Sequence, residues 1–525
     1  MRLIRRLFLG AVFLVLFALG WWVGRVGART DTYSNLDLFV EVMDRVRKNY
    51  VDATDPQKLV EGAVRGMIRG LDPYSQYLGP KQYKTLQSVT EGKFGGIGVV
   101  VGIRDNYPLV ISPIEGTPAW EAGLRSGDII VRIEGQSSAG LTIEDVADRL
   151  RGDPGSKVSL SLRREGDAED HDVTLARQII VTRSVPYAFM AAPGIGYVRL
   201  ADFSEKSGAE VRAAVERLRA GGARGAILDL RANPGGLLSQ AVDVAEEFLP
   251  RGKLIVYTHG RLTDQDQRYY STENQPLMQW PMVVLVDNAS ASASEIVAGA
   301  LQDLDRALIL GRVTFGKGSV QSVFPLRSHD AALKLTTALY YTPSGRSIHR
   351  PTRDTTDVDE DDDAAPRDSS APAKPALFRT EAGRKVYGGG GITPDLIVMP
   401  DSLPPVTARV EQRSLPLRFV NRWMNSHREA RQDAGSPVPW SEFVGYLRQE
   451  KFAATPTDLE RERPTLERAL RREIARRCCG DSAAARVLLD SDPVYRRALE
   501  VLARARTPRE VYSAAGLAAL PERRR

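Results

Sequence analysis

The spacing of apolar residues divides the chain into stretches with a helix period and stretches with a strand period. Between residues 36 and 83, apolar residues recur every three to four positions, which is the spacing of amphipathic helices. From Lys93 to about Thr182, short apolar runs separated by turn residues predict strands, with short helices at residues 118–124 and 142–150. The first helical face consists of Leu36, Phe39, Val40, Met43, Val46 and Tyr50.

From residue 196 onwards, apolar strand-like runs alternate with helix-like runs. The predicted strands are residues 196–200, 225–230, 282–286, 308–310, 320–326 and 333–340, and the predicted helices are 205–218, 237–249 and 295–304. This alternation indicates an α/β core with parallel strands. Beyond Ser402 the pattern is helical again, most clearly at residues 418–423 and 466–474. The fold class predicted is therefore α+β and multidomain.

Composition shifts along the chain give the domain boundaries. The predicted order is a signal peptide or signal anchor (1–30), an N-terminal helical segment (31–92), a β-rich domain (93–182), an α/β core (183–350 and 376–400) interrupted by an acidic insert (351–375), and a C-terminal helical region (401–525). The insert is rich in Asp, Pro, Ala and Ser, so we expect it to be disordered. It lacks the ordered glycine and terminal glutamate of a calcium-binding loop.

The N-terminus has the pattern of a membrane-targeting segment. Arg2, Arg5 and Arg6 precede an apolar run, 7–23, that only glycines interrupt. Positive charge before an apolar run places the rest of the chain outside the cytoplasm. We expect an uncleaved anchor in the cytoplasmic membrane, with the protein on the periplasmic side of the cell envelope. Cleavage after Val26-Gly27-Ala28 is the alternative.

Charge and cysteine content narrow the function classes. The formal net charge of +6 is modest for 525 residues. Many arginines of the chain lie on helical segments, such as residues 471–472 and 476–477. We interpret them as solvated helix faces, not as a surface that binds nucleic acid. The only cysteines, Cys478 and Cys479, are adjacent. Adjacent cysteines rarely bridge each other, so the sequence predicts neither a disulfide framework nor a zinc site, and an intermolecular bridge stays open.

The candidate chemistry lies in a cluster of serines, residues 288–295, between a buried strand and a helix. This geometry can present a hydroxyl at a helix N-terminus, where N–H groups bind a developing anion. Lys317, between two glycines, can serve as base once it is desolvated, and Val313, Phe315 and Val320 are expected to supply the apolar surroundings. None of the five histidines lies in a motif with an acid partner.

Three motifs together resemble the carboxyl-terminal processing proteases, peptidase family S41. They are the runs 288–303, 316–321 and 342–348, within a match that extends from the N-terminal helices to Ile397. The resemblance implies an α/β core of the ClpP/crotonase type with Ser292 as nucleophile, Lys317 as general base and Gln321 as the residue that orients the lysine. The 25 positions between Ser292 and Lys317 match the spacing of the family.

The resemblance also implies an oxyanion hole. One N–H group would come from Ala293 and the other from Gly235 or Gly236, with Gly235 favoured. Ser290 and Ser294 are then expected to build the turn and the first turn of the helix.

The β-rich segment resembles a PDZ domain. The resemblance rests on the glycine loop at residues 94–101 and on the run at residues 122–130. PDZ domains bind a C-terminal peptide as an added strand, and loop N–H groups receive its carboxylate. Gly96, Ile97 and Gly98 are the residues predicted for that loop.

The sequence thus predicts a serine endopeptidase that cleaves proteins near their C-termini and needs no cofactor and no metal. Its predicted partners are protein or peptide substrates with accessible C-termini, the inner membrane, a second copy in a homodimer and a regulatory adaptor, but no nucleic acid. The alternatives are a non-catalytic, membrane-anchored PDZ or ligand-binding scaffold, and a hydrolase of small acyl substrates with the same oxyanion geometry.

Overall fold

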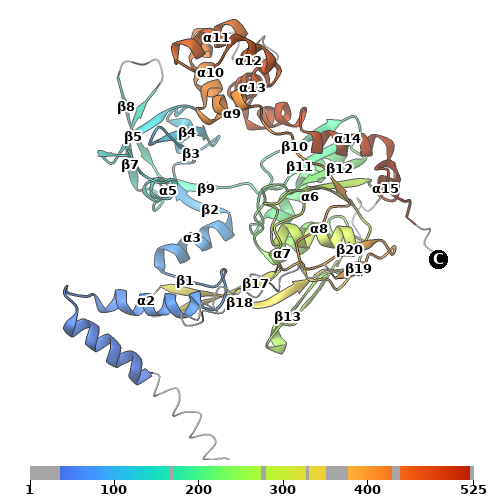
Figure 1. Cartoon of the computed structure of the whole chain (residues 1–525), viewed down its shortest axis with the longest axis horizontal. Helices are drawn as coiled ribbons and strands as arrows, with labels where there is room; N and C mark the ends of the chain where they lie inside the picture. The colour runs from blue at the N-terminus through green and yellow to red at the C-terminus, as the bar shows by residue number, and fades with distance from the viewer. Residues whose placement is uncertain are drawn as a thin grey trace, which may run out of the picture. The chain divides into compact units, whose positions relative to one another are not determined.

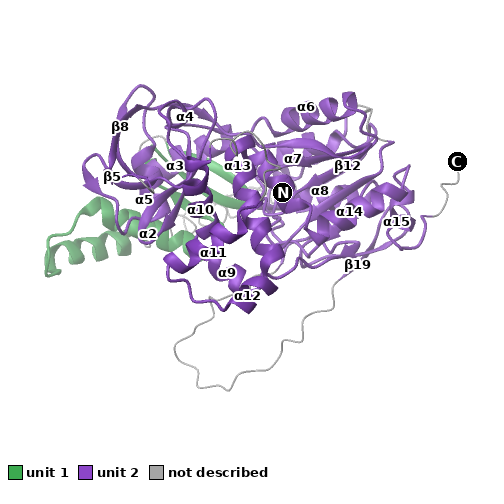
Figure 2. Ribbon diagram, turned by 90° about the horizontal axis from the view of Figure 1, so that it is seen from above, with its two compact units in different colours: residues 1–80, 321–336 green, residues 81–320, 337–525 purple. Residues whose placement is uncertain are grey.

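The computed structural model describes residues 36–164, 167, 169–272, 279–326, 330–350, 376–427 and 438–520. The chain divides into two compact units, residues 1–80 with 321–336 and residues 81–320 with 337–525 (Figure 2). The signal segment (1–30) and the acidic insert (351–375) lie outside the described residues, so both stay predictions. Within the ranges described, no helix is long and apolar enough to cross a bilayer.

The first unit contains the N-terminal helices. Residues 36–49 are helical, and α2 (Pro56–Arg69) and β1 (Gln76–Leu78) follow. The strand lies inside the segment predicted to be helical, because the Asp72 side chain accepts the N–H groups of Tyr74 (2.7 Å) and Ser75 (2.9 Å) and so fixes a turn. Strand β1 then pairs antiparallel with residues 332–334 of β18 (Ala331–Tyr341).

Both N-terminal helices expose apolar side chains. Leu38 is 62% exposed and Met67 68%, while the small core of this unit contains Ile68 and Tyr77. The predicted homodimer is untested and stays a prediction.

The second unit begins with α3 (Pro80–Glu91) and the β-rich segment. That segment contains β2 (Lys93–Gly96), β3 (Val99–Arg104), β4 (Tyr107–Pro113), α4 (Pro118–Glu121), β5 (Ile129–Ile133), β6 (Gln136–Ser137), α5 (Ile143–Leu150), β7 (Lys157–Arg163), β8 (His171–Ala176) and β9 (Gln178–Val181). Strands β3, β4, β5, β7 and β8 form an antiparallel sheet in that order, with β3 at one edge. Helix α5 begins where predicted, because Thr142 and Asp145 form a capping box.

The α/β core is built on a six-stranded sheet in the order β10-β11-β12-β15-β16-β21. Its elements are β10 (Ala188–Ala192), β11 (Ile195–Arg199), α6 (Ser207–Ala220), β12 (Gly225–Asp229), α7 (Leu238–Glu246), β15 (Met282–Val286), α8 (Ala293–Asp303), β16 (Leu308–Gly311) and β21 (Leu396–Ile397). Within this sheet, strands β11, β12, β15, β16 and β21 run parallel to one another, as the alternating pattern predicts. Strand β10 pairs antiparallel with β11 at the edge of the sheet.

Helices cover both faces of this sheet (Figure 1). Residues of α6, α7 and α8 pack on one face, and α14 (Pro493–Arg504) and α15 (Glu510–Ala514) pack on the other. All five residues of β15 are buried, which explains its uninterrupted apolar sequence. Because helices cover both faces, the polar loops lie at the carboxyl ends of the strands.

A smaller sheet and a hairpin complete the core. They consist of β13 (Leu254–Gly260), the short helix η1 (Thr263–Gln265), β14 (Arg268–Tyr270), β17 (Ser319–Leu326), β18, β19 (Leu377–Arg379) and β20 (Lys385–Tyr387). Within the second unit, β13 pairs antiparallel with β14 and with residues 338–341 of β18. The buried Arg346 pairs with Asp303 at the end of α8 (2.7 Å).

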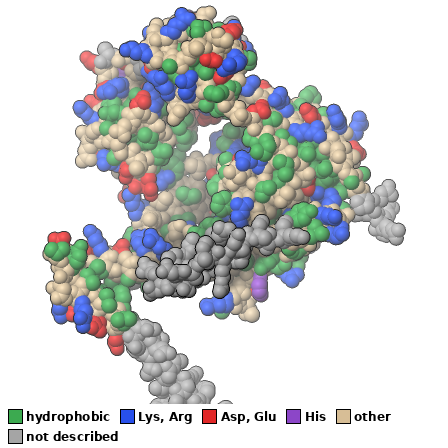
Figure 3. Space-filling view, viewed as in Figure 1, with side chains coloured by type: hydrophobic (Ala, Val, Ile, Leu, Met, Phe, Trp, Pro, Cys, Tyr) green, Lys and Arg blue, Asp and Glu red, His purple; other side chains and the backbone are tan. Residues whose placement is uncertain are grey.

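The C-terminal helices form their own apolar cluster. They are α9 (Pro405–Gln412), α10 (Leu415–Ser426), α11 (Trp440–Gln449), α12 (Pro456–Arg461) and α13 (Arg463–Leu489). Figure 3 shows Lys and Arg side chains on the surface of this region. The interpretation of its arginines as solvated faces is wrong for Arg472 and Arg476, because both pair with the buried carboxylate of Glu473 (2.6 Å each).

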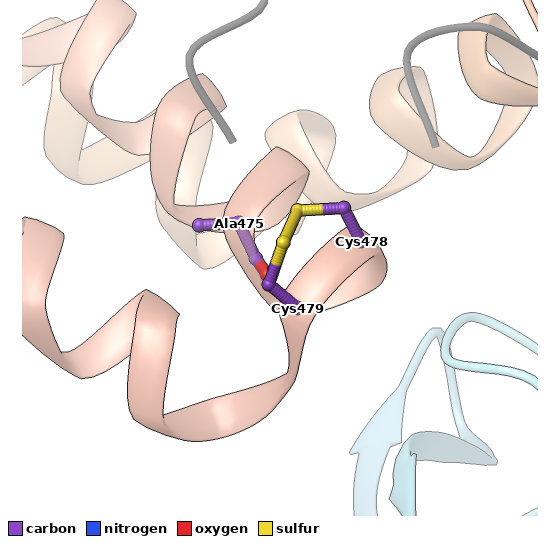
Figure 4. The surroundings of a disulfide bond; sticks show 3 residues. All are labelled: Ala475, Cys478 and Cys479. Carbon is purple, nitrogen blue, oxygen red and sulfur yellow. A yellow bond between two sulfur atoms is a disulfide. The ribbon is translucent and has the colours of Figure 1, made fainter. Parts of the chain in front are cut away.

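The two cysteines form a disulfide with each other, which corrects the sequence analysis (Figure 4). Cys478 and Cys479 lie just before Gly480, where α13 leaves helical geometry (φ 83°, ψ 179°). Glycine adopts a positive φ without a steric penalty. The pair therefore lies in the last helical residues before a break in α13.

Candidate active site

Ser292 stands at the sharp turn between β15 and α8. It is the N-cap residue of α8, and its backbone has φ 55° and ψ −112°. A non-glycine residue at positive φ costs free energy and persists only where the surroundings hold it, which is common at functional sites. The side chain is half-buried at the N-terminus of a buried helix.

The other two serines of the cluster build the turn. Both are fully buried, and their hydroxyls donate to backbone carbonyls: Ser290 to Leu230 (2.8 Å) and Ser294 to Asn233 (3.0 Å). These bonds fasten the serine turn to the loop that follows β12. Their hydroxyls therefore hold the turn in place, which is the role that the sequence analysis expected for these two serines.

The loop of residues 231–236 lies directly against Ser292. A Cβ atom added at Gly235 would lie 2.8 Å from Ser292 Cβ and 2.9 Å from the Ala293 nitrogen, so only glycine fits. The Gly235 N–H group donates to the Asn233 side chain (2.9 Å). In the part of the chain that the structure describes, the N–H groups of Gly236 and Ala293 donate to no other residue. The sequence favoured Gly235 for the oxyanion hole, whereas the available amide in this loop is that of Gly236.

Lys317 lies on a loop that is fixed to the serine turn. The Tyr340 hydroxyl contacts the backbone carbonyls of both residues, that of Ser292 at 3.0 Å and that of Lys317. Lys317 itself is half-buried. Of the three residues predicted to supply apolar surroundings, Val313 and Phe315 are 36% and 46% exposed, while Val320 is partly buried against the core. Thr314, between the two exposed residues, is buried, and its hydroxyl donates to Glu295.

Glu295 joins these two loops, and the sequence analysis did not select it. Its carboxylate is fully buried and accepts four hydrogen bonds. Oε2 accepts the N–H groups of Ser292 (2.8 Å) and Lys317 (2.9 Å), and Oε1 accepts the N–H group of Gly316 (2.8 Å) and the hydroxyl of Thr314 (2.5 Å). Burial raises the pKa of Glu295, and these four hydrogen bonds oppose the rise.

The signal for Glu295 in the sequence was its place three residues after Ser292. A glutamate at the third helical position commonly returns to the N-cap N–H group. The pattern predicts the hydrogen bond from the Ser292 N–H group. It carries no information about Lys317, 22 residues after Glu295, whose N–H group the same carboxylate accepts.

Gln321 lies in the first unit, on β17. Its side-chain amide donates to the Thr336 hydroxyl (3.3 Å) on β18. Its role as the residue that orients Lys317 stays a prediction.

The predicted carboxylate loop of the β-rich segment follows β2. Gly98 has φ 74°, and a Cβ atom there would lie within 2.5 Å of Thr117. The Ile97 carbonyl accepts the N–H group of Ala119 (2.8 Å), which ties the loop to α4. The N–H groups of Ile97 and Gly98 donate to no residue within the described ranges. They precede β3, the edge strand, so the loop has free donors at the start of an open sheet edge.

Comparison with known proteins identifies the family. The sequence matches peptidase family S41 over residues 194–359, a PDZ domain over 109–164 and the activating protease CtpB N-terminal domain over 25–81. The carboxy-terminal-processing protease of Bartonella bacilliformis is 43% identical over 322 residues, which are 61% of this chain and 73% of that protein. The chain belongs to peptidase family S41.

A second curated relative agrees with this assignment. The carboxy-terminal processing protease CtpA of Bacillus subtilis is 35% identical over 331 residues, covering 62% of this chain and 69% of that protein. Among solved structures, the photosystem II D1 C-terminal processing protease is 29% identical, with 70% of this chain and 94% of that chain covered and a TM-score of 0.38. The predicted fold class is confirmed, and the protein is a serine peptidase of family S41 with a PDZ domain.

Replacing Glu295 with glutamine tests its part in this S41 peptidase. The amide nitrogen would face the N–H groups of Ser292 and Lys317 in one orientation and that of Gly316 in the other, which costs about 1–3 kcal/mol. We expect kcat to fall about 10- to 100-fold in steady-state peptide cleavage, with a lower melting temperature.

The matched control is Glu247→Gln, which changes a buried carboxylate at the end of α7 that pairs with Arg212. It should keep the wild-type kcat. A Glu295→Gln enzyme with wild-type kcat would show that the shared carboxylate is dispensable.

Proposed function

We propose that this S41 peptidase is a serine endopeptidase that cleaves proteins near their C-termini with Ser292 and Lys317 as a catalytic dyad. The observation that carries the proposal is the shared attachment of both residues. One oxygen of Glu295 binds both of their N–H groups, and the Tyr340 hydroxyl contacts both of their carbonyls. Two residues of complementary chemistry are thus held together by one buried framework.

In the proposed reaction, neutral Lys317 takes the proton from the Ser292 hydroxyl as its oxygen attacks the scissile carbonyl. The N–H groups of Ala293 and Gly236 stabilise the negative oxygen of the tetrahedral intermediate. The C–N bond then breaks, and the lysine returns the proton to the leaving amine. Water attacks the acyl-enzyme in a second step, again with Lys317 as base, and restores Ser292. Gln321 is proposed to orient the amine.

Single substitutions of the dyad test this assignment. Ser292→Ala and Lys317→Ala should each lower kcat by more than about 10³-fold on an internally quenched peptide with a free C-terminus, since either change removes the nucleophile or its base. Circular dichroism should remain that of the wild type. The exposed residues Ser513 and Lys451 provide matched alanine controls, which should retain full activity. A wild-type enzyme that binds the peptide without cleaving it would favour the scaffold alternative.

The PDZ domain is proposed to recruit the substrate tail. The free N–H groups of Ile97 and Gly98 suit a terminal carboxylate, and the open edge of β3 suits a peptide added as a strand.

Amidation of the peptide C-terminus tests recruitment without changing the protein. We expect the amide to raise KM about tenfold or more with little change in kcat, because it removes the charge that the loop receives. Binding to the Ser292→Ala enzyme, measured by fluorescence anisotropy, should weaken equally. Equal affinities for acid and amide would contradict recruitment through this loop.

The predicted anchor would place the enzyme at the outer face of the cytoplasmic membrane. Arg2, Arg5 and Arg6 before the apolar run support this location. The full chain should stay with the membrane fraction after alkaline carbonate extraction, and a chain starting at residue 31 should be released. A mature N-terminus near residue 28, found by mass spectrometry, would instead indicate a cleaved signal peptide.

A further inference from the structure

The C-terminal helices contact the catalytic core at the start of the 231–236 loop. Arg231 is the first residue of this loop, and its guanidinium joins two carboxylates. Nε and Nη2 donate to Asp229 at the end of β12 (3.0 Å and 2.7 Å), while Nη1 binds Asp492. Burial acts to raise the pKa of Asp229, but the charge and hydrogen bonds of Arg231 outweigh burial and lower that pKa. Arg231 is therefore held as one cation between two anions.

The two carboxylate oxygens of Asp492 bind different groups. Oδ1 accepts the N–H groups of Val494 (2.8 Å) and Tyr495 (3.3 Å), so Asp492 is the N-cap of α14. Oδ2 binds Arg231. A single side chain thus fixes the start of a C-terminal helix and the start of a loop in the core.

Helix α14 has other attachments to the sheet. Tyr495 packs edge-on against Tyr197 of β11, with ring centroids 5.6 Å apart, and the Tyr197 hydroxyl donates to Asp229 (2.8 Å). Val494, Val501 and other apolar residues of α14 are buried in the same cluster. The helix should therefore stay docked when the contact between Asp492 and Arg231 is removed.

The loop is held mainly by polar contacts, among them the Asn233 side chain on the Leu200 carbonyl (3.0 Å) and the Phe203 N–H group on the Gly235 carbonyl (3.2 Å). Ala232 has φ 49°, a conformation that its neighbours must hold, and its N–H group donates to Asp287 (2.9 Å). The Asn233 carbonyl accepts the Ala291 N–H group (3.0 Å), which carries any shift of the loop to the serine turn. A cavity of about 580 Å³ borders Asp229, Arg231 and Asp492, so the arginine has room to move once it loses a partner.

We propose that Asp492 is a positioning residue of this peptidase. It acts through Arg231 to hold the 231–236 loop, and with it the Gly236 N–H group, where the oxyanion forms. The C-terminal helical region is then part of the catalytic framework. The proposal rests on the proposed function, because it assigns the loop a role at Ser292.

Asp492→Asn separates this role from the helix cap. Asparagine caps a helix as well as aspartate does, but it has no charge to offer Arg231. The matched control is Asp490→Asn, which removes the same charge from an exposed position two residues earlier. Both variants are measured with the quenched peptide and with p-nitrophenyl acetate, an activated ester that needs no tail recruitment. Hydrogen exchange of residues 231–237 and 493–504 is followed by mass spectrometry.

We expect Asp492→Asn to lower kcat about 10- to 100-fold on both substrates with unchanged KM, since a displaced oxyanion donor weakens only the transition state. Exchange should quicken in residues 231–237 and stay unchanged in α14. Asp490→Asn should match the wild type, and Asp492→Glu should recover part of the lost rate.

Unchanged kcat and unchanged exchange in the loop would overturn the proposal. Equal loss of protection in the loop and in α14 would also overturn it, because Asp492 would then act only as a helix cap. If the wild type hydrolyses neither substrate, the proposed function fails, and the exchange data alone decide whether Asp492 holds the loop.

Discussion

The arrangement of this site depends on one buried carboxylate that accepts four hydrogen bonds. Glu295 lies at the first turn of α8, yet it binds the N–H groups of Ser292 and Lys317, which come from two different loops. A carboxylate away from water needs its donors, and three of these four donors are backbone N–H groups that would otherwise be unsatisfied in the interior. Neither loop can shift without leaving a buried polar group unpaired. In this way the hydrogen bonds that stabilise the core also fix the positions of Ser292 and Lys317 relative to each other.

The fold was largely predictable because its strands are buried on both faces. Residues 282–286 form an uninterrupted apolar run, and they are β15, with the bounds expected. Strands β13 and β14 were not predicted, because β13 mixes buried with partly buried residues without a regular alternation and β14 has only three residues. Strand β1 was assigned to a helix, since helical periodicity in the neighbouring residues outweighed the turn that Asp72 makes.

Candidate residues could be selected from the sequence where they stand in short motifs. Ser292 and Lys317 were selected in this way, and their catalytic roles stay predictions, whereas Ser290 and Ser294 were assigned to the turn once the resemblance had pointed to Ser292. The surroundings of Lys317 could not be derived in this way, because the directions of Val313 and Phe315 follow from the inward hydrogen bond of Thr314. The choice between Gly235 and Gly236 likewise depends on the Asn233 side chain, which occupies one of the two amides. Arg231 and Asp492 are 261 residues apart, and no local pattern connects them.

The separation of Arg231 and Asp492 in the sequence also determines when their contact can form during synthesis of the chain. One face of the core sheet is covered by α14 and α15, which are made after every other element of the core. At about 5–20 residues per second, a ribosome needs roughly 10 to 50 seconds to add the 261 residues between Arg231 and Asp492. During this interval the strands of the sheet lack their second cover, and the loop beside Ser292 lacks one of its anchors. The order of elements in the chain therefore delays completion of the core until α14 and α15 have been made.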